Sequence, residues 1–222
     1  LIEVAKAAGY KTIWLSNQVR YGAWDTPTSA IASEADEQEW LNTHVGETTE
    51  TTTYDGALVD CLANIKPEGK MLIVIHLMGN HGSYRDRYPQ DMAAFEGDSS
   101  VDQYDNSIRY NDSVVQYLYE TVKAMPNFKG LVYCADHADD VDRNLGHDAS
   151  RFTQDMTKIP FYMMFSDSYI HENPDVVREL KEHADNRVTN DLLFNEMLAV
   201  MGIVIPQEYE KQNDLTSPAY DS

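Results

Sequence analysis

Histidine and acidic residues follow two apolar segments of the sequence, each where a buried strand would end. His81 comes shortly after "MLIVIHLM", and Asp136 and His137 come directly after "LVYCA". His147 follows ten residues later in the glycine-flanked segment "GHDAS". Imidazole and carboxylate groups are ligands that zinc prefers, so these residues could form a metal site. A polar strand end with solvated side chains is the alternative that the spacing leaves open.

The geometry of a strand limits how Asp136 and His137 could share an ion. Adjacent residues of a strand point to opposite faces, so both side chains can contact one ion only from a loop. Asp139, Asp140 and Asp142 follow closely and could orient the histidine, or could form an exposed acidic turn. The remaining histidines carry no functional prediction: His44, His76, His171 and His183.

Motifs for other kinds of chemistry are absent from the sequence. The segment "GNHG" lacks the lysine and the spacing of a Walker loop, and there is no GxSxG elbow. Cys61 and Cys134 lack metal-binding spacing and a nearby acid–base partner, so we interpret them as two small buried hydrophobic residues. The chain therefore offers metal ligands and acid–base groups but no obvious nucleophile.

Strand-like and helix-like patterns alternate along the chain. Apolar, β-branched runs predict strands at 11–15, 71–77, 129–136 and 159–166. Helical spacing predicts helices at 54–65, 102–125 with Asp102 as a cap, 174–184, and 189–201 with Thr189 or Asn190 as a cap. This alternation favours a three-layer α/β/α fold with a mostly parallel central sheet.

Ligands of such sheets collect at the carboxyl ends of the strands. The first strand should deliver Ser16, Asn17 and Gln18 to a loop at this edge, and the later strands should bring His81 and the Asp136–His137 pair to the same edge. We therefore expect the polar clusters to lie near one another.

Length and composition are those of a single domain spanning 1–222. The stretch 19–53, with its acidic run "SEADEQEW", is expected to be a surface excursion with one short helix, and 204–222 an irregular tail. The chain begins at Leu1 inside a helical pattern and without an initiator Met, which indicates a piece of a longer protein.

The net charge of -20 argues against a nucleic-acid partner, because the chain repels phosphodiester backbones. The longest apolar run, "MLIVIHLM", has the length of a strand and not of a membrane helix. The printed residues therefore predict neither nucleic-acid binding nor a membrane span.

Four stretches together resemble the sulfatase-like catalytic domain of bacterial phosphoethanolamine transferases, in the alkaline phosphatase superfamily. These stretches are "GYKTIWLSNQ", "LIVIHLMGNHGSYRDRYP", "YDNSIRYNDSVV" and "LVYCADHADDVD…GHDASRFTQDMTKIPFYMMFS". They span roughly residues 9 to 166, and the second and third are the most distinctive. The resemblance implies a truncated sulfatase-like fold.

The resemblance also assigns site residues. It implies that Asp136 and His137 bind Zn²⁺ together with a Glu and a nucleophilic Thr, neither of which has a match in this chain. His81 and His147 match histidines that bind the phosphoryl group or transfer protons, and Asn17 matches a loop that contacts the donor. The usual "DHGE" reads "DHAD" here, which puts donor contacts by Asp139 in doubt.

The implied reaction is transfer of phosphoethanolamine from a phospholipid donor to a glycolipid acceptor, lipid A or a lipopolysaccharide-core sugar, through a phosphothreonine. The implied location is the periplasmic face of the inner membrane, with membrane contact only through helices that precede the printed residues. A sulfatase-type hydrolase, a phosphoglycerol transferase and a non-catalytic binding fragment are the alternatives. Because the Glu and Thr have no match, the printed chain alone is expected to be inactive.

Overall fold

The computed structural model describes residues 1–22, 25–42, 53–207 and 209–221. The chain divides into two compact units. The N-terminal unit comprises Ile2–Pro126 and His137–Lys158, and the C-terminal unit comprises Leu1, Asn127–Asp136 and Ile159–Ser222. The expected single domain over 1–222 stays a prediction, and each unit is described by itself.

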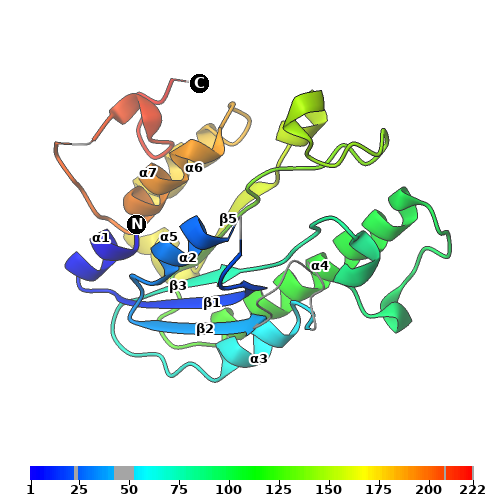
Figure 1. Ribbon diagram of the computed structural model, residues 1–222. Coiled ribbons are helices and arrows are strands. Elements are labelled where there is room, and N and C mark those ends of the chain that lie inside the picture. Colours follow the sequence, from blue (N-terminus) through cyan, green and yellow to red (C-terminus); the bar gives the residue numbers. More distant parts are fainter. Residues whose placement is uncertain (23–24, 43–52, 208, 222) are drawn as a thin grey trace. The chain divides into compact units, whose positions relative to one another are not determined.

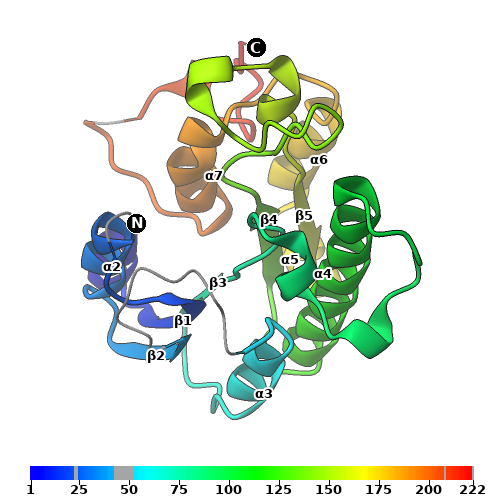
Figure 2. The same ribbon diagram turned by 45° about the vertical axis from the view of Figure 1, so that its right-hand side comes forward.

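The N-terminal unit contains a three-stranded parallel sheet. Its strand order is β2 (Glu37–Asn42), β1 (Lys11–Val19), β3 (Met71–His76). Helices cover both faces, with α1 (Ile2–Ala7) and α2 (Thr26–Ala32) on one side and α3 (Ala57–Ala63) on the other (Figure 1, Figure 2). A layered α/β unit with a parallel sheet is what the alternating pattern predicts, and the structure confirms it.

The core of this unit lies between β1 and the helices α3 and α4 (Ser100–Lys123). Alternate residues of β1 point toward one face of the sheet, which brings Ile13 and Leu15 into this core. They pack with Leu58, Leu62, Val114 and Leu118, all of them almost fully buried. Residues of β3 also pack against this core. The core packing thus fixes the positions of β1 and β3, from whose carboxyl ends the site loops begin.

Strand β1 is longer than the sequence predicts. Its ladder to β2 continues past Ser16 through a register irregularity to Val19, so Asn17 and Gln18 lie within the strand and not in a loop. Asn17 is only 1% exposed. The expectation that β1 ends near Leu15 is wrong because the prediction missed the partner strand β2.

The acidic stretch 19–53 accounts for that miss. The structure has the expected short helix, α2, but the "EQEWLN" segment also forms β2. The exposed Glu37 and Glu39 alternate with the half-buried Gln38 and Trp40 along this edge strand, and these charged residues made the segment resemble a surface loop. Part of the expected excursion, residues 23–24 and 43–52 with His44, lies outside the described residues.

Helix α4 begins two residues before the predicted start. Ser99 is its N-cap and accepts a hydrogen bond from the Asp102 backbone N–H, while the Asp102 carboxylate accepts one from the Ser99 backbone N–H. Asp102 therefore completes a capping box and is not itself the cap.

The C-terminal unit contains a separate two-stranded sheet. Strands β4 (Gly130–Cys134) and β5 (Phe161–Phe165) pair in antiparallel register. In the described residues, β4 is hydrogen-bonded to β5, and these two strands form a sheet of their own. The helices of this unit are α5 (Asp167–Glu172), α6 (Pro174–Glu182) and α7 (Leu193–Val200). Helix α5 was not predicted from the sequence.

The last segment of the C-terminal unit packs against α7. Within 204–222 the described residues contain one short 3-10 helix, Lys211–Asn213. Leu215 is almost fully buried, its backbone N–H donates to Glu196 Oε1 at 2.8 Å, and its carbonyl oxygen lies 2.8 Å from His183 Nδ1. Thr189 makes no side-chain cap, and Leu192 precedes α7 at its N-terminus.

Candidate functional site

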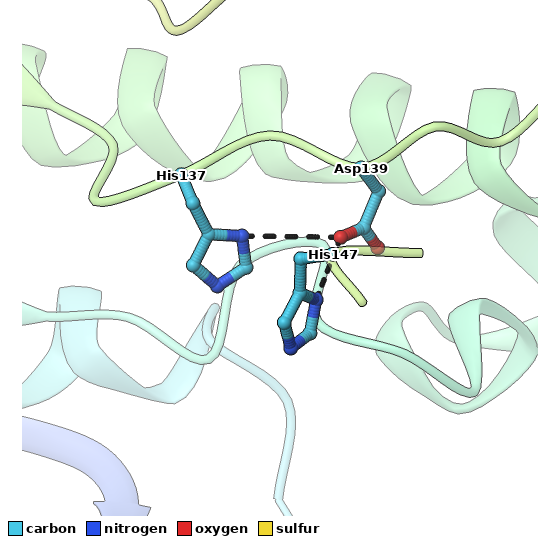
Figure 3. Close-up of side chains that lie close together, drawn as sticks. All are labelled: His137, Asp139 and His147. Carbon is cyan, nitrogen blue, oxygen red and sulfur yellow. Dashed lines mark hydrogen bonds and ion pairs between the residues drawn. The ribbon is translucent and has the colours of Figure 1, made fainter. Parts of the chain in front are cut away.

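Three residues of the N-terminal unit bring their side-chain ligand atoms together. Potential metal-binding atoms of His137, Asp139 and His147 lie within 4.8 Å of one another. His147 Nδ1 is 2.8 Å from Asp139 Oδ1, and His137 Nδ1 is 3.8 Å from the same oxygen (Figure 3). The two imidazole rings lie side by side with centroids 4.1 Å apart. This arrangement places two nitrogens around one buried carboxylate.

The Asp139 carboxylate is fixed from its other side by a tyrosine. Only 6% of the Asp139 side chain is exposed, and the Tyr84 hydroxyl donates to Oδ2 at 2.6 Å. Burial raises the pKa of Tyr84 strongly, and the hydrogen bond to Asp139 raises it further, so the phenol stays protonated and remains a donor. Tyr84 also packs edge-on against Tyr104 at 5.1 Å between ring centroids.

A second buried aspartate shapes the loop that carries His147. Asp140 is 2% exposed and accepts hydrogen bonds from the Thr153 hydroxyl at 2.7 Å and from the Arg143 backbone N–H and guanidinium. These contacts, that with Thr153 first, lower the pKa of Asp140. A backbone bridge between Asp140 and Gly146 closes the loop one residue before His147. Asp140 is therefore structural, whereas Asp142 is exposed.

His81 lies near the same cluster. Its ring centroid is 5.9 Å from that of His147. The pKa of His81 is lowered, first because neighbouring atoms partly desolvate the ring and second because the Arg87 guanidinium repels a positive charge. The sequence prediction that His81, His137 and His147 come together agrees with this geometry.

Asn17 does not lie in this cluster. Its amide nitrogen donates to Asp55 Oδ1 at 2.8 Å and to the Thr53 carbonyl at 2.9 Å. The predicted contact of Asn17 with the donor stays a prediction, and the contacts that the structure gives it are internal.

Asp136 belongs to the C-terminal unit and His137 to the N-terminal unit, so the chain passes from one to the other between them. The Asp136 carbonyl accepts a hydrogen bond from Asn190 Nδ2 at 2.6 Å. Its predicted role as a zinc ligand stays a prediction. Cys61 and Cys134 are both half-buried free thiols, and neither belongs to the cluster.

Sequence reasoning did not single out Tyr84, Asp55 or Arg87. Tyr84 and Arg87 stand in the distinctive segment "GNHGSYRDRYP", which was a signal that could have directed attention to them. Asp55 stands in an ordinary helical pattern, and only the fold shows that the residue is 6% exposed and that its carboxylate accepts a hydrogen bond from the loop after β3.

The donor set of the cluster fits a zinc ion. Imidazole and carboxylate groups are common zinc ligands. The Asp139 carboxylate is also held in place in the way expected of a group that orients a metal-binding histidine. Among the described residues, His137, Asp139 and His147 thus form a group that could hold a metal ion.

Comparison with known proteins identifies the family. The Sulfatase family model matches residues 1–203 of the chain. The phosphoethanolamine transferase EptC of Escherichia coli O18:K1:H7 (strain RS218 / NMEC) is 30% identical over 240 aligned residues, covering 99% of this chain and 41% of EptC. Phosphoethanolamine transferase CptA of Salmonella typhimurium is 27% identical, and the alignment covers 99% of this chain and 41% of CptA. The chain thus spans about 41% of the length of these relatives.

Solved structures agree with this result. The C-terminal periplasmic domain of EptC from Escherichia coli, in complex with Zn, superposes with a TM-score of 0.88 at 26% identity, covering 100% of this chain and 66% of that one. The soluble domain of lipooligosaccharide phosphoethanolamine transferase A from Neisseria meningitidis shares the fold, with a TM-score of 0.77 at 21% identity over 96% of this chain and 69% of that one. Among the helices of the described residues, none combines the length and the apolar composition of a membrane span. The chain belongs to the sulfatase family, and the resemblance to phosphoethanolamine transferases is confirmed.

Proposed function

We propose that the protein containing this chain is a zinc-dependent phosphoethanolamine transferase. The donor is a phospholipid, and the acceptor is a hydroxyl or phosphate group of lipid A or of the lipopolysaccharide core. The observation that carries the proposal is the grouping of His137, Asp139 and His147, with His81 beside it, in a chain similar to EptC over 99% of its length. The zinc in the solved EptC domain supports the choice of ion.

His137 would hold the ion together with Asp136, as the resemblance implies, and Asp139 would keep the neighbouring His147 in place. When bound, zinc would lower the pKa of a coordinated hydroxyl and offset negative charge on the phosphoryl oxygens.

The hydrogen bond between His147 and Asp139 determines which ring nitrogen is available for chemistry. In a neutral imidazole whose Nδ1 donates to this carboxylate, Nε2 has the free lone pair. Nε2 points away from Asp139 in Figure 3. His147 can therefore accept a proton from the attacking alcohol at Nε2, and His81 can donate a hydrogen bond to a phosphoryl oxygen nearby.

The proposed reaction has two displacements at phosphorus. The oxygen of a threonine outside the printed residues attacks, the bond from phosphorus to the diacylglycerol oxygen breaks, and diacylglycerol leaves with a proton. An acceptor oxygen then attacks the phosphothreonine, and the threonine hydroxyl is regenerated. General acid–base assistance of this kind typically contributes about 10²- to 10⁴-fold.

A transfer assay tests the proposal. The protein with its native flanking sequence is incubated with lipid A and, in parallel reactions, either phosphatidylethanolamine or phosphatidylglycerol, and the products are identified by mass spectrometry. The proposal predicts lipid A that has gained one phosphoethanolamine group, released diacylglycerol, and loss of both products after chelation. Three results would contradict the proposal. Free phosphoethanolamine without modified lipid A would show a hydrolase, and transfer only from phosphatidylglycerol would show a phosphoglycerol transferase. The absence of any turnover would favour a binding protein.

A further inference from the structure

The loop after β3, which carries His81, is held by a buried carboxylate on a different element. Asp55 lies just before α3 and is 6% exposed. Its Oδ1 accepts the Met78 backbone N–H at 2.9 Å, and its Oδ2 accepts the Gly79 backbone N–H at 2.8 Å. Two consecutive backbone donors directed at one carboxylate define the bend of the chain at this point.

A second buried residue secures the other end of the same loop. Arg87 is 5% exposed, and its Nε and one terminal nitrogen donate to the carbonyl oxygens of His81 and Gly82, both at 3.1 Å. His81 therefore lies between a point fixed by Asp55 and a point fixed by Arg87.

The backbone between these two points adopts uncommon conformations. Gly79 has φ +59° and Ser83 has φ +62°, both in the left-handed region. Glycine adopts this region freely, but serine does so only where surrounding contacts impose it. Two such residues, on either side of His81, indicate that the fold imposes one particular path on this loop.

Asp55 has no role in the chemistry derived so far, although burying a carboxylate is unfavourable. Burial raises its pKa, against the opposing effect of the Met78, Asn17 and Gly79 donors. The Asn17 amide, which also donates to the Thr53 carbonyl, sets the orientation of the carboxylate. The buried Asp55 carboxylate binds the loop that carries His81, a candidate catalytic histidine. It is therefore suited to positioning His81.

We propose that Asp55 is a positioning residue for the transfer reaction, fixing the turn at Met78 and Gly79 and thereby the place of His81 without touching the substrate. The inference rests on the proposed function for the role of His81. The hydrogen bonds themselves can be tested independently of turnover.

The test compares Asp55→Asn with Asp60→Asn, a matched change at an exposed aspartate of α3. Asparagine retains the shape but presents N–H donors where a carboxylate oxygen accepted. In the protein with its native flanking sequence, hydrogen exchange of the peptide 76–83 should become at least about tenfold faster in Asp55→Asn only, with the α4 peptide 107–118 unchanged. The value of kcat for transfer should fall about 10- to 100-fold while KM stays within about threefold.

Unchanged exchange in the peptide 76–83 would overturn the inference, and so would faster exchange with full kcat. If the unsubstituted protein transfers nothing, the proposed function fails, while the exchange result still decides whether Asp55 fixes the turn. If Asp55→Asn loosens the whole N-terminal unit, Asp55→Glu takes its place, since it keeps the charge and both oxygens but adds one methylene. Faster exchange confined to 76–83 would then support the inference, and exchange at the original rate would overturn it.

Discussion

At the scale of single residues, Asp139 replaces the Glu of the usual "DHGE" motif, a change expected to disturb donor contacts. The structure gives the shorter side chain internal contacts, with His147 on one oxygen and Tyr84 on the other. The sequence could identify the histidines because they follow apolar strands. It could not identify Tyr84, because only the fold brings residues 55 positions apart into contact.

Alanine at Asp136 or His137 is expected to abolish zinc-dependent transfer, because each would remove a ligand of the ion. The matched control is His171→Ala, at an exposed histidine of α5 outside the cluster, which should leave transfer unchanged. Transfer rates measured with and without added zinc check this. Equal losses in all three variants would show that the site lies elsewhere.

The Tyr84→Phe substitution removes one hydroxyl and keeps the ring. Without this donor the Asp139 carboxylate loses a 2.6 Å hydrogen bond, so His147 is held less firmly. We expect kcat for transfer to fall about tenfold, with the free energy of unfolding lowered by about 1–2 kcal/mol. Tyr117→Phe, at an exposed tyrosine, is the control for both measurements. Full activity in Tyr84→Phe would mean that Asp139 needs no such support.

At the scale of elements, the apolar runs predicted β1, β3, β4 and β5, and helical spacing predicted α3, α4, α6 and α7 to within a few residues. Strand β2 was missed because "EQEWLN" has the charged side chains of an edge strand. Such a strand lacks the continuous apolar run by which the buried strands were predicted. The antiparallel pairing of β4 with β5 was missed because a short apolar run carries no information about the direction of its partner.

The capping box of α4 gives a prediction at this scale. Ser99→Ala removes the acceptor for the Asp102 backbone N–H, and the loss should lower the free energy of unfolding by about 1 kcal/mol. Gln116→Ala, at an exposed position within the same helix, should change it by no more than about 0.5 kcal/mol. Urea unfolding followed by circular dichroism compares the two. Equal effects would contradict the capping assignment.

At the scale of the whole molecule, the chain carries a net charge of -20 and two compact units, each with buried carboxyl groups. Glu196 in α7 is fully buried and accepts the Leu215 backbone N–H with Oε1. Burial is the main reason that its pKa rises from 4.5 to about 7, and the nearby Asp214 raises it further. The folded state therefore favours the protonated acid.

This shift makes the stability of the fold depend on pH. Above about pH 4.5 the unfolded chain releases the Glu196 proton, whereas the folded state retains it. The stabilisation that this carboxyl group contributes to the folded state is therefore fully present at lower pH. The free energy of unfolding therefore falls as pH rises from about 4.5 to 7, by about 3 kcal/mol. Glu196→Gln should remove this decline and be the more stable protein at pH 8, whereas Glu182→Gln, at an exposed position, should retain it. Thermal unfolding between pH 4.5 and 8 measures this, and identical profiles for both variants would refute it.

Anomalous X-ray diffraction at the zinc edge can show whether His137 binds a zinc ion. Crystals of the protein grown with zinc should show an anomalous peak about 2.0–2.1 Å from a ring nitrogen of His137. The peak should disappear in His137→Ala and persist in His171→Ala. A fully occupied zinc ion bound away from His137, or no zinc in crystals of active protein, would contradict zinc binding at this site.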